Sequence, residues 1–249
     1  MEFITSLQNP LVKRLVKLRT NQDFRKEEGT VLVEGVKMVN EICQMSSPIT
    51  LIVSHPEMIP EALKSFPIQT VSEEVMQKIS GTQNPEGILA EVSYPQPKKF
   101  KKLKKLLILD KINDPGNLGT LLRTALAFAW EGIFLVKGGC DPFNDKALRA
   151  SKGALFRLPY FEGHWSDAVK MIQEFSLEAL AADLVGTPVN ELKLPYGVAL
   201  TLGNESHGLS EDAKKHCAPV TIPMQGKMES LNVAVAGGIL MYTLAGEIK

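Results

Sequence analysis

Three segments of the sequence combine glycines with side chains that could bind an anion or hold a reacting group. In the first, Asp114-Pro115-Gly116 predicts a turn after an apolar run, Asn117 is a good helix N-cap, and Arg123 follows within two turns. Exposed N–H groups at a helix start attract anions, and Arg123 would add a fixed positive charge. The segment suits a phosphate of an RNA backbone. Alternatively, Asn117 is only a cap and Arg123 only pairs with a surface acid.

The second segment, residues 200–209, again joins a predicted strand to a loop bounded by glycines, Gly203 and Gly208. Glu205 would lie at the end of that strand, where ligand sites gather in open α/β sheets. A turn glycine beside a solvated glutamate is the competing interpretation. His207 has no orienting partner nearby in the sequence, so we interpret it as incidental to the chemistry.

The third segment, residues 222–238, places Met224 and Gly226 in a loop and Ser230 and Asn232 at the start of a helix. That helix is apolar on nearly all sides, which predicts that it is buried. Polar side chains at a buried helix start need hydrogen-bond partners, and a ligand could supply them. The alternative is that Ser230 only caps the helix.

Alternating strands and helices must position these segments. The hydrophobic pattern predicts strands at 106–109, around Leu180, and at 133–136, 198–202 and 220–222, and helices at 117–130, 146–151, 166–175, 210–216 and 231–245. Such alternation is typical of an α/β domain with a mostly parallel sheet covered on both faces. The usual glycine-rich fingerprint is missing after the first strand, which counts against a nucleotide-cofactor oxidoreductase and favours a ligand site built by later loops.

The first 96 residues predict a separate small α/β domain. A helix with a basic face is expected at 11–18, strands at 30–33, 49–53 and 88–92, and further helices at 36–45 and 61–66. Residues 97–105 form a proline- and lysine-rich linker, so the expected domains are 1–96 and 106–249. Six of the eight residues from Lys98 to Lys105 are lysine, and a second basic cluster lies between Lys13 and Lys26. These charges favour RNA binding or, alternatively, only solvate the surface.

Composition excludes several classes of protein. The 249 residues carry 28 basic and 28 acidic side chains, a balance that argues neither for nor against nucleic acid. No apolar run is long enough to span a membrane, and no basic segment followed by an apolar stretch predicts a secretory signal. Three scattered cysteines, Cys43, Cys140 and Cys217, fit a reducing compartment and exclude a disulfide framework or a CxxC zinc site. We expect a cytoplasmic protein.

In this order and spacing, the three segments resemble the signature motifs of the SpoU (TrmH-like) family of SPOUT RNA 2′-O-ribose methyltransferases. The matches are Asn117-x-Gly119-x-x-x-Arg123, the Gly203-Asn204-Glu205 loop, and the run from Ile222 to Ala236. The resemblance covers residues 106–249 strongly, and residues 1–95 more weakly resemble the family's L30e-like substrate-binding domain. The second motif departs from many relatives, which carry glycine after the acid where this chain has Ser206-His207.

The resemblance implies a fold, a reaction and an assembly. The fold would be an L30e-like α/β domain followed by a trefoil-knotted SPOUT domain, with two copies packed as a homodimer through the knotted domains. The reaction would transfer a methyl group from S-adenosylmethionine to a ribose 2′-hydroxyl of RNA, without a metal. Ribosomal RNA is the preferred substrate. A transfer-RNA substrate and a non-catalytic RNA-binding role on the same fold are the alternatives.

The same resemblance assigns roles to individual residues. The positions implicated in catalysis or acceptor binding are Asn117, Arg123, Glu205, Ser230 and Asn232. The positions expected at the donor pocket are Gly203, Ile222, Met224, Gly226 and Leu231. Arg123 is expected to serve the partner's donor site, either as general base or as an anchor for phosphate and for charge on the 2′-oxygen. We prefer the anchor, because guanidinium keeps its proton in proteins.

Overall fold

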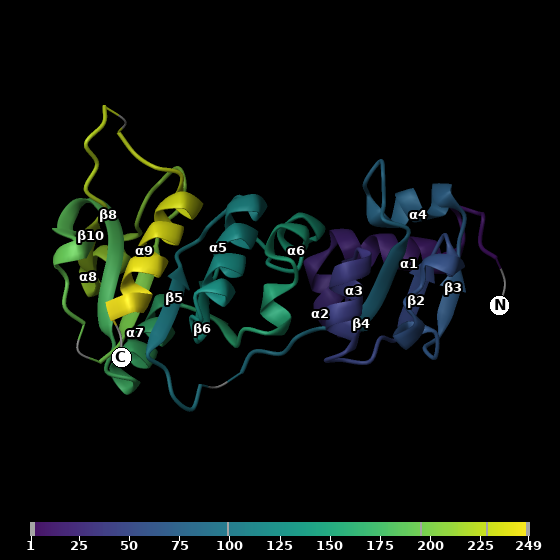
Figure 1. Cartoon of the computed structure of the whole chain (residues 1–249), viewed down its shortest axis with the longest axis horizontal. Helices are drawn as coiled ribbons and strands as arrows, with labels where there is room; N and C mark the ends of the chain where they lie inside the picture. The colour runs from purple at the N-terminus through teal and green to yellow at the C-terminus, as the bar shows by residue number, and fades with distance from the viewer. Residues whose placement is uncertain (1–2, 99, 195, 228, 248–249) are drawn as a thin grey trace. The chain divides into compact units, whose positions relative to one another are not determined.

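The computed structural model describes residues 3–98, 100–194, 196–227 and 229–247, and these form two compact units (Figure 1). Unit 1 contains the chain up to Pro95 together with residues 143–153, and unit 2 contains residues 96–142 and the chain from Ala154 onward. The inclusion of residues 143–153 in unit 1 has no counterpart in the division expected from the sequence. None of the helices in the described ranges is both long and apolar enough to cross a bilayer.

Unit 1 is built on a four-stranded sheet in the order β1-β4-β2-β3. Its elements are α1 (Pro10–Thr20), α2 (Gln22–Glu28), β1 (Thr30–Glu34), α3 (Val36–Cys43), β2 (Thr50–Val53), the 3-10 turns η1 (Pro56–Met58) and η2 (Glu61–Leu63), β3 (Ile68–Thr70), α4 (Glu73–Ser80), β4 (Ile88–Ser93) and α6 (Asp145–Ser151). The sheet is mixed, because β4 runs antiparallel to β1 and β2 while β2 and β3 are parallel.

The structure confirms the basic helix α1 and corrects two details of this unit. The helix expected at 61–66 is a single 3-10 turn, since Pro67 disfavours helical backbone at the residue before it. The sequence pattern also missed α2, β3 and α4. The helix α4 has a clear start signal, because the Ser72 hydroxyl accepts a hydrogen bond from Val75 N.

Residues 143–153 are held in unit 1 by charge and by close packing. Arg149 donates to Glu34 of β1 at 3.3 Å and to Asp145 of its own helix at 2.8 Å. Gly153 has a φ of +69°, and a Cβ there would lie 2.9 Å from the Ile42 side chain of α3. Phe143, Ala147 and Leu148 are also buried, so apolar packing adds to the glycine and the ion-pair network.

An ion pair ties α1 to the central strand β4. Arg14 donates to the two carboxylate oxygens of Glu91 at 3.0 and 2.7 Å, and its Nε donates to Glu28 at 2.8 Å. The Glu91 side chain is only 3% exposed. The hydrogen bonds to Glu91 raise the pKa of Arg14, opposed by its partial burial. A buried carboxylate must be paired, so detaching α1 from the sheet would leave the Glu91 charge buried without a partner.

Unit 2 carries a six-stranded sheet in the order β10-β8-β9-β5-β6-β7, and every neighbouring pair is parallel. Its elements are β5 (Lys105–Leu109), α5 (Pro115–Ala127), β6 (Gly132–Val136), η3 (Ala154–Phe156), β7 (Tyr160–Gly163), α7 (Trp165–Glu174), β8 (Glu178–Pro188), η4 (Val189–Glu191), β9 (Val198–Leu202), α8 (Glu211–His216), β10 (Ala218–Thr221) and α9 (Val233–Glu247). The predicted α/β domain with a mostly parallel sheet is confirmed.

Helices cover both faces of this sheet, α5 and α9 on one side and α7 and α8 on the other (Figure 1). Successive residues of β9 show the division. Leu202 packs at the position of Gly237 in α9, whereas Thr201 lies 3.5 Å from Cys217 at the end of α8. Strands buried on both faces explain the continuous apolar runs of the sequence.

The expected linker packs against unit 2. Lys98 N donates to Tyr160 O at 3.1 Å, Leu103 is buried, and Phe100 lies against Gly132 of β6. Lys105 already belongs to β5. Lys99 lies outside the described residues. The apolar residues interspersed among the lysines anchor this segment, while Lys101 and Lys102 stay exposed.

We predict that Arg14→Ala lowers the free energy of unfolding of unit 1 by about 3 kcal/mol, because it leaves the Glu91 carboxylate buried without its partner. Urea titration followed by circular dichroism measures the change. Lys13→Ala, one position away on the exposed side of α1, is the matched control and should shift stability by less than about 0.5 kcal/mol. Equal effects of the two substitutions would contradict the structural importance of the ion pair.

Candidate active site

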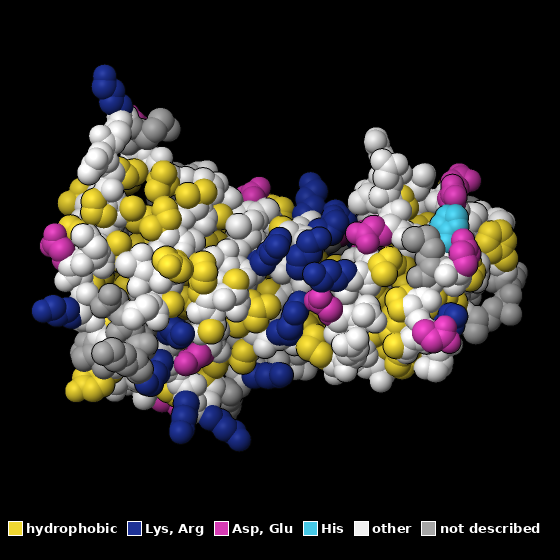
Figure 2. Space-filling view, viewed as in Figure 1, with side chains coloured by type: hydrophobic (Ala, Val, Ile, Leu, Met, Phe, Trp, Pro, Cys, Tyr) yellow, Lys and Arg dark blue, Asp and Glu magenta, His cyan; other side chains and the backbone are white. Residues whose placement is uncertain are grey.

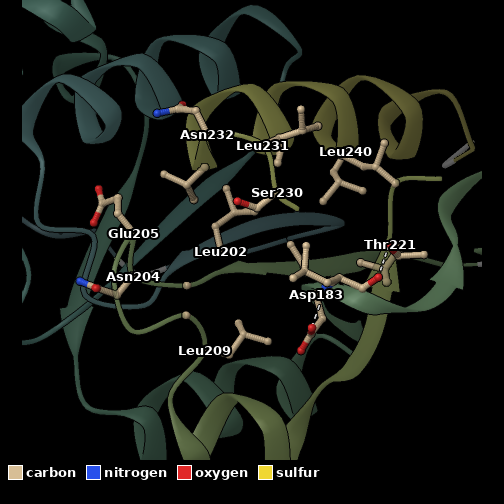
Figure 3. Close-up of a pocket in the computed structure, with 18 of the residues that line it drawn as sticks. Asp183, Leu202, Asn204, Glu205, Leu209, Thr221, Ser230, Leu231, Asn232 and Leu240 are labelled. Atoms are coloured by element: carbon tan, nitrogen blue, oxygen red, sulfur yellow. Dashed lines mark hydrogen bonds between the residues drawn. The ribbon is translucent and has the colours of Figure 1, made fainter. Parts of the chain in front are cut away.

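A pocket of about 700 Å³ opens in unit 2 beside the carboxyl ends of β9 and β10 and the middle of β8 (Figure 3). Such a position is where ligands bind in parallel α/β sheets, and the volume suits a small ligand. Eight of the ten predicted site residues line it: Asn117, Gly203, Glu205, Ile222, Met224, Ser230, Leu231 and Asn232. The structure thus brings the three sequence segments together around one cavity.

Asp114, rather than Asn117, caps the helix α5. The Asp114 carboxylate accepts a hydrogen bond from Asn117 N at 2.7 Å, and Pro115 occupies the first helical position. The expectation that Asn117 is the N-cap is therefore wrong, since the acidic residue three positions earlier already satisfies the helix start. Because Asp114 caps the helix, the Asn117 side chain is available for other partners.

Glu205 is held by three donors from the first segment. One carboxylate oxygen accepts from Asp114 N and from Asn117 Nδ2, both at 3.1 Å, and the other accepts from Asn113 N at 3.1 Å. Partial burial on its own would raise the pKa of Glu205, but these hydrogen bonds to the charged form outweigh it and the pKa is lowered. A carboxylate so engaged is a poor proton acceptor near neutral pH.

Asn232 extends this arrangement to the third segment. Its Nδ2 donates to Asn117 Oδ1 at 3.0 Å, and its Oδ1 accepts from Ala234 N at 2.9 Å. Asn232 therefore caps α9, and the alternative that Ser230 is the cap is wrong. The Ser230 side chain lies in the pocket instead (Figure 3).

The loop after β9 depends on the absence of a side chain at Gly203. A Cβ at Gly203 would lie 2.6 Å from the backbone carbon of Gly208, because Asn204 and Gly208 exchange two backbone hydrogen bonds of 2.9 Å. His207 lies in this loop and also lines the pocket. Its Nδ1 is 3.1 Å from Asn204 Oδ1, so it has an orienting partner that the sequence did not reveal.

Arg123 and Gly226 do not line the pocket. Arg123 is exposed on α5, six positions after Asn117, so the two side chains point about 120° apart around the helix. It forms no hydrogen bond or ion pair with any residue that the structure describes. Gly226 is exposed, and nothing lies within 4 Å of the position a Cβ would take there.

The pocket contains residues that the sequence pattern missed. Its apolar wall includes Leu202, Leu209, Val220 and Leu240, and its charged lining includes Asp183 and Lys214. Asp183 lies inside β8, in the part beyond Ala181 that no longer pairs with β9. That strand was placed only loosely around Leu180, so its end could not be located.

Helix α9 is not buried on all sides as expected. Val235, Ile239 and Tyr242 are 52, 39 and 68% exposed and recur at helical spacing on one face. On the opposite face, a Cβ at Gly237 would meet Leu121 and Leu202, so close packing on α5 and β9 requires glycine. Because both faces of the helix are apolar in sequence, residue types alone do not show which face packs within the unit and which is exposed.

The parallel sheet, its late loops and this pocket define an α/β protein with a ligand site at the carboxyl ends of its strands. The SpoU rRNA Methylase family matches residues 104–242, and the MRM3-like substrate binding domain matches residues 9–90. The chain belongs to the SpoU rRNA methylase family.

Similarity to individual proteins extends over both units. The 23S rRNA (guanosine(2553)-2′-O)-methyltransferase RlmP of Bacillus subtilis (strain 168) is 32% identical over 99% of this chain and 100% of its own. The 23S rRNA (adenosine(1067)-2′-O)-methyltransferase of Streptomyces azureus is 26% identical over 97% of this chain and 95% of its own. The AdoMet-bound rRNA methyltransferase from Sinorhizobium meliloti has a TM-score of 0.87 at 28% identity, covering 100% of this chain and 98% of that structure.

We predict that Glu205→Gln lowers the free energy of unfolding by about 1 kcal/mol, because an amide cannot accept all three hydrogen bonds. Thermal unfolding measures the change, and Glu174→Gln at the exposed end of α7 is the control.

Since the pKa of Glu205 is lowered from 4.5, the stability that its ionised carboxylate gives the fold is complete above that pH and is lost as the pH falls through the lowered pKa. The wild type should therefore lose melting temperature more steeply than the variant below pH 4.5, and parallel curves would contradict this.

Proposed function

We propose that this protein transfers a methyl group from S-adenosylmethionine to a ribose 2′-hydroxyl of ribosomal RNA. The observation that carries the proposal is the hydrogen-bonded chain from Glu205 through Asn117 to Asn232, which joins the three motif loops around one pocket. Two relatives similar over nearly their whole length are named as 23S rRNA 2′-O-methyltransferases. The family of the first unit is a substrate-binding domain, which supports an RNA partner there.

The pocket fits S-adenosylmethionine in size and chemistry. Its volume of about 700 Å³ accommodates a ligand of that class, and its leucine-rich wall suits an adenine ring. We propose that Gly203, Ile222 and Leu231 hold the donor, with Met224 beside it. Gly226 is exposed outside the lining and is not proposed as a contact. When bound, the donor supplies a methyl group on a good sulfonium leaving group, so no metal is required.

The protein's own task is to align the acceptor oxygen and manage its proton. Asn117 gives one N–H to Glu205 and accepts from Asn232, which leaves its second N–H for the acceptor ribose. Ser230 offers a hydroxyl in the same pocket. We propose that these two groups orient the 2′-oxygen, while Glu205 and Asn232 act as positioning residues through Asn117.

Arg123 fits the role of an anchor supplied to a second copy of the chain. It lies on the exposed side of α5, away from its own pocket and without a partner among the described residues. We propose that it binds the phosphate beside the target ribose and stabilises charge on the 2′-oxygen in the partner's site. Its guanidinium is ill suited to the alternative role of general base, because it keeps its proton.

The apolar stripe of α9 supports a homodimer. Val235, Ile239 and Tyr242 face solvent. The centroid of the Tyr242 ring lies 5.3 Å from that of Phe128, which follows α5 directly. Thr124 of α5 lies beside Gly238 of α9, so the two helices are in contact here. Figure 2 shows hydrophobic side chains gathered over α9. We propose that two copies pack through α5 and α9, because a monomer seldom leaves such a stripe uncovered. We also propose that the C-terminal part of unit 2 forms a trefoil knot. In support, the chain passes from the edge strand β10 back to the middle of the sheet, where α9 packs on β9.

Unit 1 and the exposed lysines are proposed to hold the RNA through its phosphates. Lys101 and Lys102 project from the packed segment before β5, where Phe100 and Leu103 fix the backbone. Contacts of this kind add affinity without reading sequence. We place the reaction in the cytoplasm, in keeping with a ribosomal-RNA substrate.

We predict that the purified protein transfers label from S-adenosylmethionine to 23S ribosomal RNA, and that DNA of the same sequence stays unlabelled because it lacks the 2′-hydroxyl. Scintillation counting measures transfer, and alkaline hydrolysis mapping locates the resistant 2′-O-methylated bond. Label found only in transfer RNA would show that transfer RNA, and not ribosomal RNA, is the substrate. No label together with no calorimetric heat from the donor would overturn the enzymatic function.

We predict that Arg123→Ala loses at least about 100-fold in methyl transfer while donor affinity is unchanged, because the lost interaction is with the reacting oxygen. Gly203→Val should lose donor binding instead, since its side chain meets the loop backbone. Coexpression of the two variants should restore about a quarter of the wild-type activity, because only mixed dimers contain one complete composite site.

Two outcomes would contradict this prediction. Absence of complementation would show that Arg123 acts within its own chain. An Arg123→Lys variant that transfers methyl with a new acidic limb in its pH profile would favour the general-base role over the anchor.

A further inference from the structure

Asp183 lies on the opposite side of the pocket from the catalytic cluster. It lies within β8, two residues beyond Ala181, the last residue of β8 that pairs with β9. It falls between Ala181 and Thr187, where the pairing of β8 with β10 shifts register. In Figure 3, Glu205 and Asn232 lie on one side of the cavity, and Asp183 and Thr221 lie on the other. The two carboxylates in the lining therefore face different parts of any bound ligand.

The two carboxylates also differ in what their oxygens can still accept. Both oxygens of Glu205 receive hydrogen bonds from the protein. Asp183 accepts one bond, from Leu184 N to its Oδ1 at 2.6 Å, and within the described ranges nothing donates to Oδ2. Lys214, the neighbouring cation of the lining, is paired with Glu211 at 2.9 Å. Asp183 thus presents an open, charged acceptor to the pocket.

The proposed function decides which part of the donor meets this acceptor. The methyl group must be delivered beside Asn117 and Ser230, so the sulfonium lies toward that side. The adenosine half then extends along the leucine-rich wall toward Asp183. Adenosine offers ribose hydroxyls and an exocyclic amine as hydrogen-bond donors. In the parallel sheets that bind dinucleotides, an acidic residue accepts a hydrogen bond from a ribose hydroxyl.

We propose that Asp183 is the specificity-determining acceptor for the adenosine half of S-adenosylmethionine. Its Oδ2 takes an O–H or N–H from that half, and the amino-acid tail of the donor makes no contact with it. This inference rests on the proposed function, because it requires the donor to occupy the pocket with its sulfonium at the catalytic side.

Isothermal titration with two ligands tests the assignment. S-adenosylmethionine and 5′-deoxy-5′-methylthioadenosine share the adenosine half, and only the first has an amino-acid tail. Asp183→Ala should weaken both by the same factor, about 10- to 100-fold, as expected for a hydrogen bond to a charged group. Asp183→Asn, which keeps an acceptor for Leu184 N, should show a smaller loss for both. Asp212→Ala, which removes an exposed carboxylate outside the lining, is the matched control and should bind as the wild type does.

The outcomes separate this inference from the function on which it rests. A loss for S-adenosylmethionine alone would assign Asp183 to the amino-acid tail and overturn the proposal, as would unchanged binding of both ligands. A wild type that binds neither ligand would overturn the proposed function itself. Repeating the titration with 5′-deoxy-5′-methylthioinosine, which lacks the exocyclic amine, identifies the donor group. A persisting effect of Asp183→Ala supports the ribose hydroxyls, and a vanished effect supports the amine.

Discussion

The hydrogen bonds from Glu205 to Asn117 and from Asn117 to Asn232 hold together loops that are far apart in the chain. The first joins residues 88 positions apart and the second joins residues 115 positions apart. Within this series of hydrogen bonds, each polar side-chain atom of Glu205, Asn117 and Asn232 has a defined donor or acceptor role. This fixes the orientation of the Asn117 and Asn232 side-chain amides. Because Glu205 also receives two backbone N–H groups, the loop before α5 and the loop after β9 are tied to each other at three points.

That constraint depends on small local features that carry no chemistry themselves. Asp114 caps α5 and so releases the Asn117 side chain. Gly203 lets the loop after β9 close on the backbone of Gly208, which directs Glu205 toward α5. Gly237 brings α9 close to β9 and α5, and its helix start carries Asn232. In each case a backbone requirement in one element sets the position of a polar side chain from another.

Helix α9 serves two surfaces at once. Its glycine-containing face packs within the unit, while Val235, Ile239 and Tyr242 leave an apolar stripe exposed. The proposed dimer would cover this stripe and would bring Arg123, which points away from its own pocket, to a second site. A site shared between copies would explain why Arg123 and the pocket loops lie on different sides of one chain. Assembly and catalysis would then depend on the same pair of helices.

The sequence by itself determined the parallel α/β architecture and the three motif segments, because these follow from local periodicity and short-range spacing. The resemblance of those segments to the family motifs implied the site residues, eight of which line the pocket. Only the tertiary structure decided the rest. The outward direction of Arg123 depends on which face of α5 packs inward, and the place of Asp183 in the pocket lining depends on how β8 lies beside β9 and β10. Residues 143–153 join unit 1 through Arg149 and Gly153, a long-range packing choice. Such contacts are set by chain topology, and no local pattern encodes them.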